Sequence, residues 1–158
     1  MQTALAATTP SSWQDDLQLG YGPIDRLHEE FVNLLGALLA APDVEMAEAL
    51  GALHGHLREH FASEERWMQE TDFPARACHA DEHAAVLQSM EKVSLQVAAG
   101  DFHAGRHLAS ALADWFPGHT DYLDSALAHW MCKRQSGGKP LVFRRSIAKQ
   151  DTKIQHPD

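Results

Sequence analysis

Apolar residues recur at steps of three and four over most of the chain, and this spacing predicts amphipathic helices. Residues 20–23 form a turn before the first helix, and the break at residues 42–43 precedes the second. A third helix should start after residues 72–74 and a fourth after residues 100–101. No stretch shows the alternation of a β-strand. Four such helices with short connections predict an all-α, up-down-up-down four-helix bundle.

Polar residues stand at core-facing positions of these helices. The stripe of the second helix consists of Leu50, Leu53, Leu57, His60, Glu64 and Trp67. His60 and Glu64 are four residues apart, so they lie on one face, one turn above the other. Burying an unpaired carboxylate costs several kcal/mol, so Glu64 should be paired, neutralised or bound to a metal.

The other three helices also carry histidine on their stripes. These residues are His28 early in the first helix, His79 and His83 early in the third, and His119 late in the fourth. Because neighbouring helices in such a bundle are antiparallel, these positions should meet His60 and Glu64 at one end. Asp124 adds a second carboxylate. Five helical steps turn it by about 500° from His119, so the two should approach a central site from different sides.

The fourth helical pattern contains a proline. Its stripe consists of Leu108, Leu112, Trp115, His119 and Tyr122. Pro117 lacks a backbone N–H, so it should kink or interrupt the helix and could shift its local register.

The remaining histidines are not expected to bind the metal. His56 and His107 lie one position off their stripes, and His103 lies at the far end of its helix. His54 and His156 should be solvated, and His129 should be a hydrogen-bonded core residue. The competing interpretation makes all of the core histidines unrelated. It would have to place five of them on four stripes, at one height, beside two carboxylates.

Composition narrows the classes of function. A chain of 158 residues suits one domain, and a formal charge of -9 argues against binding nucleic acid or anionic membranes. No apolar run approaches the roughly 18 residues of a membrane span. Two cysteines make no disulfide framework, and residues 1–10 lack the basic start of a secretory signal. A cytoplasmic protein is therefore expected. We also expect a monomer.

The two ends of the chain differ from its centre. Residues 1–12 are small and polar, so they should form a mobile arm, with the bundle in residues 13–135. Residues 133–158 hold seven of the thirteen basic residues and two acidic ones, leaving this end at +5 and residues 1–132 at -14. The basic tail, residues 136–158, should be solvated, fold back on the acidic bundle, or dock an acidic protein partner.

The donor set limits the choice of metal. Five imidazoles and two carboxylates are too many for one tetrahedral zinc and suit two ions that share bridging carboxylates. Calcium and magnesium prefer mainly oxygen ligands. Imidazole with carboxylate suits iron, manganese, cobalt or zinc, and affinity alone does not choose among these metals.

These motifs resemble those of the hemerythrin family in its bacterial single-domain form, over about residues 13–132. The matching residues are Trp13, the approach from Leu19-Gly20 to Ile24-Asp25, His28, His60-Phe-Ala-Ser-Glu64-Glu65 with Met68, His79-Ala-Asp-Glu-His83, and Trp115-Phe-Pro-Gly-His119-Thr-Asp-Tyr-Leu-Asp124. All seven ligand positions of the family are occupied. Only Pro117-Gly118, before the last histidine, departs from the common pattern.

The resemblance implies two non-haem iron ions (Fe2+/Fe3+) with an oxo or hydroxo bridge, binding O2 reversibly. By analogy, three histidines hold one iron, two hold the other and two carboxylates bridge them: His79, His83 and His119; His28 and His60; Glu64 and Asp124. The iron with two histidines would keep an open position for O2. An apolar lining should exclude water, formed by Phe31, Leu35, Leu57, Phe61 and Trp115.

The implied role is that of an oxygen carrier, store or sensor rather than an enzyme. The alternatives are a di-iron peroxidase or oxidase, an iron reservoir, and a nitric oxide scavenger.

Overall fold

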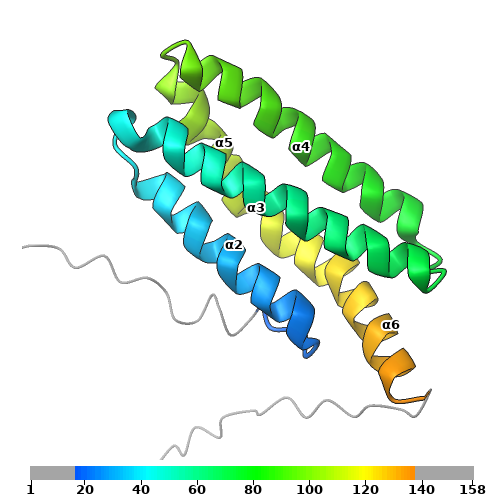
Figure 1. Ribbon diagram of the computed structural model, residues 1–158. Coiled ribbons are helices and arrows are strands. Elements are labelled where there is room, and N and C mark those ends of the chain that lie inside the picture. Colours follow the sequence, from blue (N-terminus) through cyan, green and yellow to red (C-terminus); the bar gives the residue numbers. More distant parts are fainter. Residues whose placement is uncertain (1–16, 138–158) are drawn as a thin grey trace, which may run out of the picture.

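The computed structural model describes residues 17–137, and these form a bundle of helices (Figure 1). The helices are α2 (Gly22–Ala40), α3 (Asp43–Glu70), α4 (Arg76–Ala98), α5 (Phe102–His119), the π-helical turn η1 (Thr120–Asp124) and α6 (Ser125–Gln135). The last three follow one another without a break and together make the fourth long helix. The predicted all-α four-helix bundle is confirmed. Trp13, the N-terminal arm and residues 138–158 of the basic tail lie outside the described residues.

Each helix packs against its neighbours in the sequence, and α2 also packs against α5, which closes the bundle. The core-facing residues of α2 are those that the spacing predicts: Ile24, His28, Phe31, Leu35 and Leu38. On α3 the stripe ends differently. Met68 is fully buried, whereas Trp67 is only partly buried at the edge of the bundle, where its ring meets Tyr21 at 5.8 Å.

The fourth long helix departs most from the prediction. Helical structure continues through Pro117 to His119, so the helix is not interrupted at the proline, and a π-helical turn follows at Thr120–Asp124. In a π-helix the hydrogen bonds run from residue i to i+5, which brings residues five apart onto one face. Asp124 therefore lies below His119 on the core side, and the predicted divergence of these two residues is wrong.

The same turn shifts every later core position. Tyr122, predicted to face the core, is 81% exposed, and His129 is exposed rather than part of the core. The buried residues of α6 are instead Leu127, Ala128, Met131 and Cys132. The single π-helical turn shifts the register of the later residues, which is enough to move the predicted stripe onto the solvent side.

Two apolar clusters lie above and below the polar residues of the core. The larger includes Phe31 and Leu57, and the smaller includes Ile24, Met68 and Leu127. On α2, His28 falls between members of the two clusters, and on α3 Glu64 does the same. The bundle thus buries one polar layer between two apolar ones.

Candidate metal centre

Side chains from α2, α3, α4 and the fourth long helix form the buried polar layer. It contains His28, His60, Glu64, His79, His83, His119 and Asp124, each between 0 and 4% exposed. These are the seven residues that the sequence singles out. They form two overlapping groups whose donor atoms are close enough to share an ion: His28, His60 and Glu64; and Glu64, His79, His83, His119 and Asp124.

Glu64 divides its two carboxylate oxygens between the two groups. Its Oε1 lies 2.9 Å from Nε2 of His60, and its Oε2 lies 3.4 Å from Nε2 of His79 and 3.2 Å from Nε2 of His83. The carboxylate therefore stands between two sets of imidazole nitrogens, with one oxygen facing each set.

Asp124 repeats this arrangement from the opposite wall. Its Oδ2 lies 2.9 Å from Nε2 of His28, and its Oδ1 lies 3.0 Å from Nε2 of His79 and 3.1 Å from Nε2 of His119. The π-helical turn makes this possible, because it carries Asp124 to the core side five residues after His119.

Most of these close contacts do not have hydrogen-bond geometry. The pair His60 Nε2 and Glu64 Oε1 does, but both oxygens of Asp124 and Nε2 of His28, His79, His83 and His119 have no hydrogen-bond partner. Buried polar atoms are normally paired. Nitrogen and oxygen atoms that converge without hydrogen bonds between them are suited to binding metal cations. Five imidazoles and two carboxylates, divided into two groups, fit a di-metal site of the transition-metal type.

Charge in the layer is set by competition between burial and close contact. Burial and the neighbouring Asp124 both oppose ionisation of Glu64, but contacts with His60, His79 and His83 lower its pKa below the usual value. Burial likewise opposes ionisation of Asp124, yet its histidine contacts hold its pKa well below 3.8. For His79, burial favours the neutral ring, but Asp124 and Glu64 outweigh it and raise the pKa to about 9.

We expect the metal-free protein to lose stability as pH rises from 6.5 through about 9. The pKa of His79 is 6.5 in the unfolded chain and about 9 when folded, so its contribution is complete below pH 6.5 and is lost as pH passes through 9. The raised pKa of His119 acts in the same direction. Urea unfolding of metal-free protein across this range should show a falling free energy of unfolding.

The matched variant is His79→Gln, in which the fall should be smaller. Metal-loaded protein should not show this fall in the free energy of unfolding, because metal ligation requires neutral imidazole. A flat profile for the metal-free parent would contradict the expectation.

Aromatic rings pack against two histidines of the layer. Phe61 stacks on His83 with ring centroids 3.9 Å apart and planes 5° apart, and Trp115 lies 4.4 Å from His119. Of the predicted lining, Phe31, Leu35, Leu57 and Phe61 are buried, and Trp115 is partly exposed.

Phe116 was missed by the sequence analysis, although it continues the stripe of Leu108 and Leu112 at a step of four. It is buried and meets the ring of His28 edge-on at 5.0 Å.

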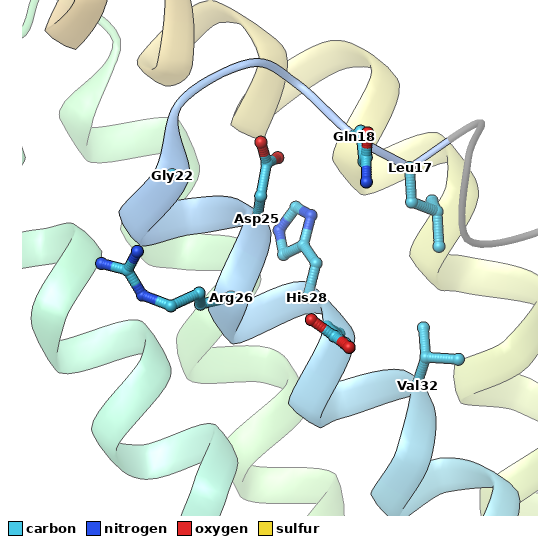
Figure 2. A pocket seen from close by; sticks show the side chains of 8 residues that line it. Leu17, Gln18, Gly22, Asp25, Arg26, His28 and Val32 are labelled. Carbon is cyan, nitrogen blue, oxygen red and sulfur yellow. The ribbon is translucent and has the colours of Figure 1, made fainter.

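A cavity of about 280 Å³ reaches His28 from the N-terminal side of α2 (Figure 2). It is lined by Leu17, Gln18, Gly22, Asp25, Arg26, His28, Glu29 and Val32. Asp25 holds the preceding loop in place, since its carboxylate accepts hydrogen bonds from the backbone N–H groups of Leu19, at 2.7 Å, and Gly20, at 3.1 Å. The layer therefore adjoins open space on its His28 side.

The histidines of residues 17–137 that were predicted not to bind metal lie outside the layer, and His156 is not among the described residues. His56 is tied to α2, with Nε2 3.1 Å from the carbonyl oxygen of Leu27 and Nδ1 3.3 Å from Glu30. His103 and His107 are exposed, and His54 is partly buried.

A four-helix bundle that encloses five histidines and two carboxylates at one level is the class of fold and site suited to holding a pair of metal ions. Residues 19–130 match the family model described as the hemerythrin HHE cation binding domain, and the chain belongs to the hemerythrin family. This confirms the resemblance drawn from the sequence motifs. No helix among residues 17–137 combines the length and apolar character needed to cross a bilayer.

Curated relatives carry the name bacteriohemerythrin. The chain is 37% identical to one from Ralstonia nicotianae over 77% of its own length and 89% of that protein. It is 28% identical to one from Stenotrophomonas maltophilia, over 80% and 90% of the two chains. It is 31% identical to one from Aquifex aeolicus, over 66% and 85%. No solved structure matches the chain significantly.

Proposed function

We propose that this chain holds two iron ions in its polar layer and binds O2 reversibly. The observation that carries the proposal is the division of the oxygens of Glu64 and Asp124 between two groups of imidazoles. Two carboxylates shared in this way suit a pair of ions held side by side. Membership of the hemerythrin family favours iron among the metals that such donors accept.

The proposed ligands are His79, His83 and His119 for one iron, His28 and His60 for the other, and Glu64 and Asp124 as bridges. When bound, the iron pair supplies the electrons that reversible O2 binding requires. The half with two histidines leaves room for an external ligand and adjoins the cavity at His28. The apolar clusters and the rings of Phe61 and Trp115 keep bulk water away from the layer.

We expect the purified protein to contain close to two irons per chain and no haem. Metal analysis combined with an absorption spectrum measures both. A single tightly bound zinc per chain would refute the dinuclear proposal, because one tetrahedral ion would leave three of the seven donors unused.

Stopped-flow mixing of the reduced sample with O2, and then with H2O2, tests the function itself. A long-lived oxygenated spectrum that reverses when O2 is removed supports the carrier or store. Rapid turnover with an added electron donor would instead support the peroxidase or oxidase.

A further inference from the structure

Two glutamates at the protein surface reach the outer nitrogens of two proposed ligands. Oε1 of Glu65 lies 3.3 Å from Nδ1 of His83, and Oε2 of Glu82 lies 2.6 Å from Nδ1 of His119. The side chains of Glu65 and Glu82 are 45% and 47% exposed, so both carboxylates stand at the boundary between the layer and solvent.

The inner nitrogens of the same two histidines face the bridging carboxylates. Nε2 of His83 lies 3.2 Å from Glu64, and Nε2 of His119 lies 3.1 Å from Asp124. A carboxylate that accepts a hydrogen bond from Nδ1–H keeps the proton of the neutral ring on Nδ1. The lone pair of Nε2 is then free to face inward. Each glutamate therefore selects the tautomer that ligation through Nε2 needs.

The two contacts also link three helices in sequence. Glu65 follows Glu64 on α3 and reaches His83 on α4, while Glu82 precedes His83 on α4 and reaches His119 on α5. Each glutamate is thus the neighbour of one proposed ligand in the chain and the hydrogen-bond partner of another on the next helix.

The arrangement is not shared by the other three proposed histidine ligands. Among the described residues, Nδ1 of His28, His60 and His79 has no hydrogen-bond partner. Both glutamates therefore act on the group of three histidines and neither acts on the group of two. A carboxylate behind a metal-bound imidazole raises the basicity of that ligand, which favours the more highly charged metal ion.

We propose that Glu65 and Glu82 are positioning residues that make the three-histidine half of the centre the tighter metal site and the half that more readily holds ferric iron. The proposal rests on the proposed di-iron function. It assigns the asymmetry of the centre to the outer carboxylates as well as to the number of histidines.

The test compares Glu65→Gln and Glu82→Gln with the parent and with Glu91→Gln. Glu91 is an exposed residue of the same helix as Glu82, with no described polar contact, so its variant makes the same change of charge away from the centre. Metal retention is measured by chelator competition and the midpoint potential by redox titration. We expect about 10–100-fold weaker retention and a higher potential in the two test variants.

Glu82→Gln should have the larger effect, because its contact is the shorter. A second variant, Glu82→Ala, separates charge from orientation. Glutamine keeps an acceptor for the Nδ1 proton, so Glu82→Ala should lose more metal than Glu82→Gln. Parent-like retention and potential in both glutamine variants, matching Glu91→Gln, would overturn the proposal.

Co2+ titration of the metal-free proteins, followed by absorption, separates this proposal from the choice of iron. If the parent purifies without iron, the proposed function fails. Weaker Co2+ binding in Glu82→Gln than in Glu91→Gln would still support the positioning role, and equal binding would refute it.

Discussion

Replacing Glu64 with alanine should abolish the dinuclear centre. Glu64 is the one residue that belongs to both donor groups, and its two oxygens face different sets of histidines. Its removal leaves the His28 and His60 group without a carboxylate at this position. We expect at most one metal ion per chain, with the remaining ion in the three-histidine half.

The same change should also destabilise the bundle. Glu64 is fully buried against imidazoles, and removing one partner of a buried charged pair typically costs about 3–5 kcal/mol. Urea unfolding followed by circular dichroism measures this loss, and elemental analysis counts the metals.

Glu48→Ala provides the control, because Glu48 is an exposed residue of the same helix. It should keep the metal content and stability of the parent. Two metal ions per chain in Glu64→Ala would show that Glu64 is not a bridge.

The fold and the membership of the polar layer follow largely from the spacing of residues. On α2 the predicted and observed core positions coincide, because an uninterrupted α-helix keeps one face through steps of three and four. His60 and Glu64 could be recognised because they replace apolar residues on such a face. Whether the seven side chains bind metal, and which metal, remains a prediction that geometry supports.

The sequence could not locate the change of helix type in the fourth long helix. Pro117 cannot donate a backbone hydrogen bond, but the chain remains helical there. The π-helical turn begins three residues later. A stripe extrapolated with α-helical steps therefore placed Tyr122 and His129 on the wrong side. Burial of the polar pair His119 and Asp124 depends on packing against the other helices. The local spacing of residues carries no information about that packing.

The outer glutamates were also beyond the reach of periodicity. Glu65 and Glu82 fall beside the core stripe, where charged residues are ordinary, and each is directly adjacent to a proposed ligand. Their partners lie on other helices, 18 and 37 residues away in the chain. The distance between neighbouring helices decides whether such a glutamate is solvated or contacts a histidine of the layer, and residue spacing does not give that distance.

Leu57→Ala should weaken the wall between the polar layer and the larger apolar cluster. Leu57 is fully buried, one turn before His60 on the same stripe of α3. Truncating a buried leucine typically costs about 2–5 kcal/mol and leaves a cavity. A cavity at this position adjoins the proposed two-histidine iron, so it should admit water and speed the loss of bound O2 by autoxidation.

Leu53→Ala is the matched control, because Leu53 is equally buried in the same cluster but lies a further turn from His60. Both variants should lose stability by similar amounts, since both remove the same atoms from one core. Only Leu57→Ala should shorten the lifetime of the oxygenated protein, measured by absorption at matched iron content. Equal lifetimes in the two variants would mean that the wall of the site lies elsewhere. The aromatic rings that cover His83 and His119 would then be the side chains that keep water out.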